Sequence, residues 1–351
     1  MSTAAAGVLE YPVAAPPPPG VVQEIAAGVL WLRMPLPFAL DHINLWLLPE
    51  RDGGCTLVDC GYGDIPTRAL WERHFGATLR AMPIRRIVAT HYHPDHVGNA
   101  AWLSRRFDAP VAMTNAEYLT AHAVAEGFGG HTPGATIDLF RRHGMTEADR
   151  TALAQRGNAY RRGVPDLPQV IEAMQAGDAW PAGDTTWRII GGHGHSPDHA
   201  SLFCAERGVL ISGDMLLPKI STNVSVHPFD PDGNPLRRFL DSISAFLDLP
   251  SDTLVLPSHG LPFRGIALRV GQLRAHHDAR LGELEAAVRA AAAPLCAADL
   301  VPVLFRRVLD LQQRYFAMGE AIAHLNHLWR AARLSRLVDA SGTIRFAPPV
   351  G

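Results

Sequence analysis

The sequence predicts a layered α/β fold that carries a helical insertion and a helical C-terminal domain. Three observations support this prediction. Short apolar runs typical of strands alternate with helical periodicity along most of residues 21–265, as in folds where helices cover sheets. Helical patches separated by glycine and proline interrupt this alternation at about residues 115–180. From residue 266 to residue 351 the pattern is almost purely helical.

The first strands and helices are expected after a flexible N-terminal arm. Residues 1–20 end in consecutive prolines and a glycine, a composition that favours an extended and mobile segment. Beyond the arm, apolar runs bounded by turn residues indicate strands, and apolar spacing of three to four residues indicates helices. The expected strands cover residues 28–34, 44–48, 56–59, 87–90 and 111–113, and the expected helices cover residues 65–79 and 99–107.

The second part of the chain continues with the insertion, further strands and the C-terminal helices. Within the insertion, helices are expected at residues 117–126, 137–142, 147–160 and 167–174. Strands are then expected at residues 185–190, 200–204, 209–211 and 253–256, with a helix at residues 235–247. Amphipathic helices at residues 268–292, 297–310 and 318–332 precede residues 343–346, which are expected to belong to a β-hairpin.

The composition indicates a folded protein of the cytoplasm. Hydrophobic residues make up 47% and charged residues 19% of the 351 positions, which excludes a disordered chain. The formal net charge of −2 provides no strong attraction to nucleic acid or to an anionic membrane. The sequence contains neither an apolar run of membrane-spanning length nor a secretory signal. The scattered cysteines suggest no disulfide framework, which favours a reducing compartment.

A dense group of metal-ligand side chains follows the expected strand at residues 87–90. His91, His93, Asp95 and His96 place imidazole and carboxylate groups within six residues. These are the groups that bind divalent transition metals in proteins. Because a loop that leaves a strand end can turn alternate side chains toward one point, the segment predicts a metal site.

Three later segments repeat this pattern of an apolar strand followed by a ligand-type residue beside glycine. They contain His193 and His195 before Ser196-Pro197, Asp214 after Gly213, and His259 between Ser258 and Gly260. Strand ends that meet at one edge of a sheet would gather all these side chains. Such a set fits two metal ions with one shared carboxylate.

With these residues in this order, the chain resembles the metallo-β-lactamase-fold hydrolases, among them glyoxalase II, lactonases and thioesterases. The similarity covers roughly residues 21–265 and implies an αββα sandwich with the active site on one edge. Residues 21–265 are therefore expected to be the catalytic domain. Residues 266–351 resemble the winged-helix-like C-terminal extension of some of these hydrolases.

The resemblance also implies a role for each site residue. His91, His93 and His195 would hold the first metal, Asp95, His96 and His259 the second, and Asp214 would bridge the two. Asp59 would brace the ligand loop from outside, and His199 is expected to support the ligands rather than bind metal. Asp95 and Asp214 are the expected catalytic residues.

The expected chemistry follows from two neighbouring cations. They would lower the pKa of a bridging water to near neutrality and polarise the carbonyl oxygen of the substrate. Asp95 would orient the nucleophile. We expect two zinc ions, with iron or manganese as alternatives, and hydrolysis of the ester, thioester or lactone bond of a small acyl substrate.

Several assignments compete with alternatives. His193 is the rival of His195, but the family turn places the ligand directly before Ser196-Pro197. His324 and His327 lie three residues apart on an expected helix, and a structural or solvent role is expected for both.

Substrate contacts are harder to predict than metal ligands. Lys219, Asn223 and His227 follow Asp214 and are candidates for binding a substrate carboxylate or the oxyanion, although an ordinary loop position is the alternative for Lys219. The apolar residues of the insertion would form a small core of their own or line an acyl pocket under a lid.

Two other activities remain open at the sequence level. The modest excess of arginine in residues 266–351 suggests an RNA-cleaving phosphodiesterase of the same fold, although packing or dimerisation is the favoured role of this region. An iron-dependent redox enzyme of the same fold is the other alternative. The expected partner is a small molecule, without nucleic acid or membrane, and a homo-oligomer is compatible with the sequence.

Overall fold

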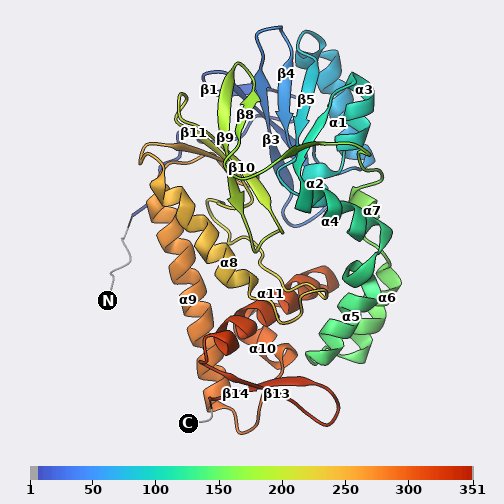
Figure 1. Cartoon of the computed structure of the whole chain (residues 1–351), viewed down its shortest axis with the longest axis vertical. Coiled ribbons are helices and arrows are strands. Elements are labelled where there is room, and N and C mark those ends of the chain that lie inside the picture. The colour runs from blue at the N-terminus through green and yellow to red at the C-terminus, as the bar shows by residue number, and fades with distance from the viewer. Residues whose placement is uncertain (1–6, 350–351) are drawn as a thin grey trace.

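The computed structural model of the chain describes residues 7–349, and the first residues of the predicted arm, 1–6, lie outside the described residues together with residues 350 and 351. Two β-sheets face each other in the upper part of the molecule, and the C-terminal helices lie below them (Figure 1). This arrangement confirms the predicted α/β sandwich with a helical insertion and a helical C-terminal region.

The first sheet contains seven strands in the order of the chain. Its first strands pair in antiparallel fashion and its last strands pair in parallel, so the carboxyl ends of the parallel strands meet at one edge. Its strands are β1 (Gln23–Ala26), β2 (Val29–Pro35), β3 (His42–Pro49), β4 (Cys55–Val58), β5 (Ile84–Val88), β6 (Val111–Thr114) and β7 (Glu172–Met174).

The second sheet contains five strands in the order β12-β11-β10-β9-β8. Only β11 and β12 pair in parallel within it. Its strands are β8 (Ala179–Ala182), β9 (Thr185–Gly192), β10 (His199–Cys204), β11 (Val209–Gly213) and β12 (Leu254–Pro257).

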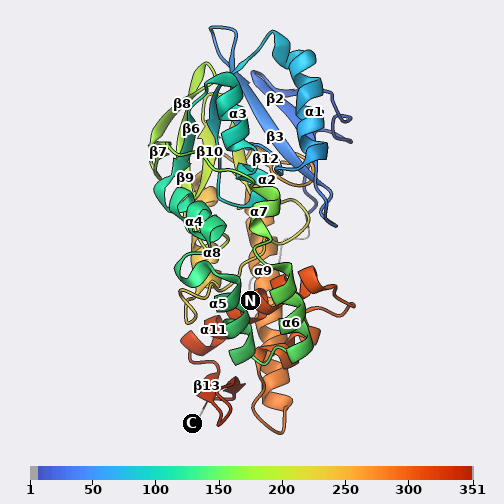
Figure 2. The same ribbon diagram turned by 90° about the vertical axis from the view of Figure 1, so that its right-hand side faces the viewer.

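Helices cover the outer faces of both sheets, as Figures 1 and 2 show. The first sheet is covered by α1 (Ile65–Gly76), α3 (Ala100–Phe107) and α4 (Asn115–Glu126), and the short α2 (Pro94–Val97) carries part of the ligand motif. The second sheet is covered by α8 (Pro235–Ser242) and by the start of α9 (Ile266–Ala290). No helix within residues 7–349 combines the length and the apolarity that crossing a membrane requires.

Large apolar side chains fill the interior between the two sheets. Trp31, Trp46 and Trp187 are fully buried there, and Val58 and Val88 pack with them. Their burial removes apolar surface from water and fixes the positions where β4 and β5 end. Asp59 follows the end of β4, and the segment that begins with His91 follows the end of β5.

The insertion lacks the separate small core that its apolar residues suggest. Leu139, Phe140 and Met145, on and just after α5 (Pro133–Arg142), join a core that includes the C-terminal helices. The neighbouring helices are α6 (Glu147–Arg156) and α7 (Tyr160–Gly163). Both views place α5 beside α11 (Leu311–Arg330).

Several expected helices have different ends or do not form. The helix expected at residues 167–174 is wrong, because residues 172–174 pair in parallel with β6 as strand β7. The helix expected to reach residue 310 ends at Leu304, and the helix expected to reach residue 247 changes to 3₁₀ form after Ser242. For residues 172–174 the pairing with β6 outweighs local helix propensity.

The C-terminal region starts with α9 at Ile266, which marks its boundary along the chain. It contains α9, α10 (Ala297–Leu304), α11 and the hairpin β13 (Ser335–Val338) and β14 (Ile344–Ala347), so the expected hairpin is confirmed. Part of the predicted arm reaches this boundary, since Glu10 pairs with Arg264 and Leu9 is buried.

Candidate metal centre

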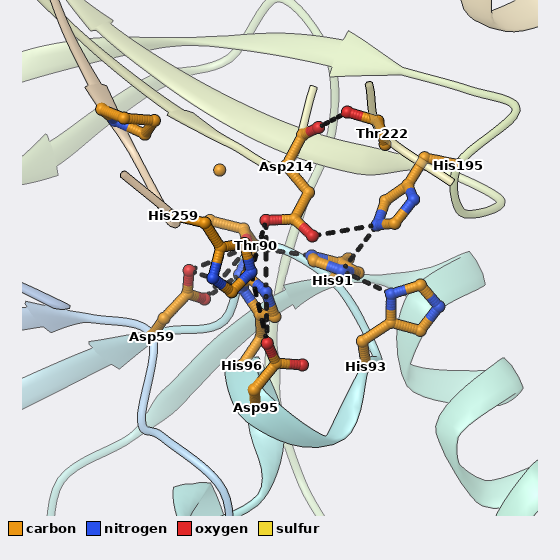
Figure 3. Close-up of polar contacts among 12 residues, drawn as sticks. Asp59, Thr90, His91, His93, Asp95, His96, His195, Asp214, Thr222 and His259 are labelled. Carbon is orange, nitrogen blue, oxygen red and sulfur yellow. Dashed lines mark hydrogen bonds and ion pairs between the residues drawn. The ribbon is translucent and has the colours of Figure 1, made fainter. Parts of the chain in front are cut away.

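The predicted ligand residues meet at one edge of the two sheets, where several strands end (Figure 3). His91, His93, Asp95 and His96 follow β5, and His195 lies in the turn between β9 and β10. Asp214 follows β11, and His259 follows β12. Residues far apart in the sequence are thus brought together because strands of the two facing sheets end at the same edge.

A first group of potential ligand atoms comes from His91, His93, His195 and Asp214, and these atoms lie within 4.8 Å of one another. His91 Nε2 is 2.9 Å from His93 Nδ1 and 3.2 Å from His195 Nε2. Asp214 Oδ2 is 3.4 Å from His195 Nε2. Imidazole nitrogens and one carboxylate oxygen therefore converge on a single point.

A second group comes from Asp95, His96 and His259, whose ligand atoms also lie within 4.8 Å of one another. Asp95 Oδ2 is 3.6 Å from His96 Nε2 and 3.4 Å from His259 Nε2. Asp214 Oδ1 faces the same two nitrogens at 3.5 and 3.4 Å. The two oxygens of Asp214 therefore face different groups, which is the geometry of a shared ligand.

Hydrogen bonds outside the cluster orient the imidazole rings. The Nδ1–H of His195 donates to the main-chain oxygen of Asn223 at 2.8 Å, and the Nδ1–H of His259 donates to that of His42 at 2.7 Å. His96 contacts Asp59 Oδ2 through Nδ1 at 2.9 Å. Because a carbonyl or carboxylate oxygen only accepts, each Nδ1 carries a proton, and each Nε2 is left as the nitrogen that would offer its lone pair to a bound metal.

Asp59 braces the ligand segment from behind. Its carboxylate accepts hydrogen bonds from the main-chain nitrogen of Thr90 at 2.8 Å and from the Thr90 hydroxyl at 3.0 Å. Its backbone has φ of 62°, a left-handed conformation that aspartate tolerates better than most residues. The structure thus places Asp59 next to the ligand set rather than within it.

The charges of the cluster favour a bound cation. Burial lowers the pKa of His96, but the carboxylates of Asp59, Asp95 and Asp214 outweigh burial and raise the pKa to about 9. Burial opposes ionisation of Asp95, yet the imidazoles of His96 and His259 lower its pKa to about 2. Buried carboxylates therefore attract positive charge, which protons or metal ions can supply.

The residues present fit divalent metal ions. His96 Nε2 and Asp214 Oδ1 are buried and have no hydrogen-bond partner, although buried polar atoms normally have one. Both atoms point into the cluster, where a cation would satisfy them. Imidazole nitrogen and carboxylate oxygen are suitable donors for zinc, iron or manganese.

The alternative histidines lie outside the two ligand groups. His193 is exposed and its Nδ1 contacts the main-chain oxygen of Pro197 at 2.8 Å, so it points away from the cluster. His199 lies beneath the cluster, where its Nε2 accepts a hydrogen bond from the main-chain nitrogen of Asp214 at 3.1 Å. His324 contacts His277 at 3.1 Å, and His327 contacts Asn234 at 3.2 Å.

Glycines permit the sharp turns that deliver His195 and Asp214. Gly194 has φ of 95° and Gly213 has φ of 53°, which favour glycine because it has no Cβ. A Cβ at Gly194 would lie 2.3 Å from the main-chain oxygen of Pro235. The chain can therefore approach α8 closely only with glycine at this position.

Glu117 supports the site but was missed by the sequence analysis. Its buried carboxylate accepts hydrogen bonds from the main-chain nitrogen of Tyr92, from the Ser196 hydroxyl and from the main-chain nitrogen of Asp198. Burial raises the pKa of Glu117, and these hydrogen bonds oppose that shift. Thr114 three residues earlier caps α4, which indicated a helix start but not this contact.

The three candidate substrate-binding residues, Lys219, Asn223 and His227, lie in different surroundings. Lys219 is exposed and lines a surface cavity of about 310 Å³ with Ser221 and Arg269. His227 stacks on Phe229 with ring centroids 5.3 Å apart. Asn223 contacts His195 through its main-chain oxygen.

Comparison with known proteins agrees with this geometry. The sequence profile of the metallo-beta-lactamase superfamily matches residues 40–259, and that of the metallo-beta-lactamase-like C-terminal domain matches residues 283–349. The probable metallo-hydrolase YqjP of Bacillus subtilis (strain 168) is 24% identical over 306 residues, which cover 86% of this chain and 92% of that protein. A hydroxyacylglutathione hydrolase of Vibrio cholerae serotype O1 is 32% identical over 69 residues, which cover 20% of this chain and 25% of that protein.

A solved structure extends the similarity to nearly the whole chain. The beta-lactamase domain protein from Burkholderia ambifaria has a TM-score of 0.88 at 45% sequence identity, and the alignment covers 97% of this chain and 98% of that one. The superfamily profile spans more than half of the chain and includes every residue of both ligand groups. The chain therefore belongs to the metallo-beta-lactamase superfamily.

Proposed function

We propose that this metallo-hydrolase uses a two-metal centre to cleave the ester, thioester or lactone bond of a small acyl substrate. The observation that carries this proposal is the position of Asp214. Its Oδ2 faces His195 at 3.4 Å, while its Oδ1 faces His96 at 3.5 Å and His259 at 3.4 Å. A carboxylate between two ligand groups is suited to hold two cations close together.

The residues divide between the two metals as their positions suggest. His91, His93 and His195 would hold one ion, Asp95, His96 and His259 the other, and Asp214 both. When bound, the ions would acidify a water molecule and polarise the substrate carbonyl. We propose zinc for both positions, because zinc accepts mixed imidazole and carboxylate ligands.

Asp95 has the position of a residue that orients the attacking water. Its side chain is 18% exposed, whereas that of His96 beside it is fully buried. Asp95 therefore lies at the solvent side of the cluster, where its carboxylate can accept a hydrogen bond from water. The lowered pKa of Asp95 keeps it ionised and ready to accept at neutral pH.

The surroundings of the cluster support an acyl substrate over RNA. Tyr92 and Tyr160 lie beside His93, with ring centroids of Tyr92 and His93 4.6 Å apart and those of the two tyrosines 6.1 Å apart. Aromatic side chains suit an uncharged acyl group, whereas a nucleic-acid backbone requires a row of basic residues. The partial match to a hydroxyacylglutathione hydrolase also supports a thioester.

The test combines metal analysis with a substrate panel. Purified protein should contain close to two metal ions per chain, and removal of the metal with a chelator should abolish hydrolysis of thioesters or lactones. Added zinc should restore it. Full activity in the metal-free protein would exclude the proposal. Cleavage of single-stranded RNA, or iron with a visible absorption band and redox activity, would favour the two alternative activities.

A further inference from the structure

We infer that helix α11 of the C-terminal region positions the metal ligand His195 through Glu320 and Asn223, which would be positioning residues of the metal centre. This inference rests on the proposed metal centre. It gives the C-terminal region a part in building the site, in addition to packing. It also assigns Asn223 to support of His195 rather than to substrate binding.

The orientation of His195 depends on one main-chain oxygen. His195 Nδ1 donates to the oxygen of Asn223 at 2.8 Å, while its Nε2 faces His91 and Asp214. If the oxygen of residue 223 moves, the imidazole ring must turn or lose its partner. The position of Asn223 therefore decides where the lone pair of His195 points.

Asn223 lies in a segment that itself forms neither a helix nor a strand. Residues 214–234 connect β11 with α8 without regular secondary structure. At the start of this segment the Thr222 hydroxyl donates to the main-chain oxygen of Asp214. The rest of the segment must be fixed by contacts with other elements, because a connection without regular structure is otherwise mobile.

Helix α11 contacts Asn223 itself and the residues that directly follow it. Glu320 Oε2 accepts a hydrogen bond from Asn223 Nδ2 at 3.4 Å, and Asn223 Oδ1 accepts one from the Ser225 hydroxyl at 2.7 Å. The main-chain oxygen of Gly319 accepts from Val226 at 3.4 Å. A Cβ at Gly319 would lie 2.6 Å from Ser225 Oγ, so the helix and the segment touch closely at this glycine.

The same helix holds the far end of the segment. Asn326 Nδ2 donates to the main-chain oxygens of Pro231 at 2.9 Å and Gly233 at 3.0 Å. Arg330 Nε donates to the main-chain oxygen of Asp232 at 2.8 Å. The segment is therefore attached to the shared ligand Asp214 through Thr222, to α9 through Arg269, which donates to the main-chain oxygens of Leu217 and Ile220, and to α11 from Asn223 to Gly233.

The buried carboxyl group of Glu320 is expected to add little to the stability of the fold. Burial raises its pKa to about 7, and its hydrogen bond with Asn223 only partly offsets this shift. A carboxyl group that resists ionisation in its surroundings contributes little to folding stability. Its replacement is therefore expected to leave the fold intact and to affect the orientation of Asn223.

The experiment measures metal affinity instead of activity. Metal-free full-length protein is titrated with Co²⁺ in competition with a chromophoric chelator, and the visible spectrum of bound Co²⁺ reports ligand geometry. Glu320→Ala and Asn223→Ala should weaken binding at one of the two metal positions about tenfold and change the spectrum. Glu320→Gln, which keeps an acceptor oxygen, should restore most of the affinity.

Controls separate positioning from general stability. Glu283→Ala removes a hydrogen-bonded glutamate of α9 that pairs with Arg280 and Arg306, and it should leave both metal affinities unchanged. Ser225→Ala removes one hydroxyl that touches Asn223 and should weaken one metal position several-fold, even if the other variants fail to fold.

The outcomes distinguish the inference from the proposed function. Wild-type affinity and spectrum in Ser225→Ala and in folded Glu320→Ala would overturn the inference while leaving the metal centre intact. Equal weakening at both metal positions, with a matching loss of thermal stability, would also overturn it in favour of a merely structural role. A wild-type chain that binds no Co²⁺ would overturn the proposed metal centre and the inference together.

Discussion

Single residues outside the ligand set decide how the ligands point. Asp59 touches both Thr90 and His96, and Glu117 joins the first ligand segment to the turn that carries His195. These carboxylates bind no metal in the proposed site, yet they orient the groups that would. Their effect should therefore appear in metal affinity before it appears in the overall fold.

Asp59→Asn tests this expectation. Asparagine tolerates the left-handed backbone at this position but removes the negative charge beside His96. Metal affinity should fall about 10- to 100-fold, as found when partners of metal ligands are removed. Asp108→Asn is the matched control, because Asp108 also has positive φ of 52° but is exposed at the end of α3. Equal metal affinity in the two variants would contradict the proposed role.

Elements position the site through their ends and their close contacts. Gly213 ends β11 directly before Asp214, and its left-handed backbone turns the chain into the cluster. Packed against it, His199 holds the main-chain nitrogen of Asp214. The end of this strand therefore determines where the shared carboxylate lies.

Gly213→Ala should be more harmful than an equivalent change elsewhere. A Cβ there would lie 2.3 Å from Nε2 of the buried His199, in addition to the cost of positive φ. Gly208→Ala is the control, since Gly208 has φ of 60° and no atom within 4 Å of a Cβ. Denaturant unfolding should give a loss of about 1 kcal/mol for the control and about 2–4 kcal/mol for Gly213→Ala. Similar losses would show that His199 does not confine this position.

Helices α9 and α11 are joined by two neutral histidines. His324 Nδ1 donates to the main-chain oxygen of Glu320 at 2.8 Å, so its Nε2 must accept from His277 Nδ1 at 3.1 Å. Burial, with His324, His276 and His327 nearby, lowers the pKa of His277 to about 3. Burial likewise lowers the pKa of His324 to about 4. A proton added to His324 Nε2 would break the pairing, and a proton added to His277 would lie on its buried Nε2, which has no hydrogen-bond partner.

This pairing makes the stability of the fold sensitive to acid. Between about pH 6.5 and pH 4 the unfolded chain binds protons at these positions and the native chain does not. Stability is therefore retained above about pH 6.5 and lost as pH falls, by up to about 1.4 kcal/mol per pH unit for each histidine. In the presence of a chelator, His277→Asn should reduce this slope by about one proton relative to the wild-type chain. Identical slopes in urea unfolding would refute the assignment.

At the scale of the whole molecule, the α/β sandwich and the C-terminal helices share one core. Phe239 and Phe246 below the second sheet belong to the same buried cluster as Leu273 of α9 and Ile322 of α11. Leu139 of the insertion joins them. The predicted division at residue 265 is therefore a boundary in sequence, across which the apolar packing continues.

A fragment of residues 1–265 should not fold into a metal-binding domain. Each large side chain exposed by the truncation costs about 1.5–3 kcal/mol, and several together exceed the usual stability of a domain. The full chain should unfold in one calorimetric transition with matching van't Hoff enthalpy. A soluble fragment that binds metal, or two separate transitions, would contradict this expectation.

The sequence by itself identified the residues that come together at the cluster, because each follows a buried strand within a few positions. The resemblance to the metallo-β-lactamase fold, rather than the residue pattern, distinguished His195 from His193, because the family turn places the ligand directly before Ser196-Pro197. The local sequence pattern did not predict strand β7, because its strand form depends on pairing with β6. It also did not predict the contacts of Glu117 and Glu320, because each of these side chains bonds to a segment far away in the chain. Only the tertiary structure decided which partner holds each ligand, because a hydrogen bond between distant segments leaves no periodic trace in the sequence.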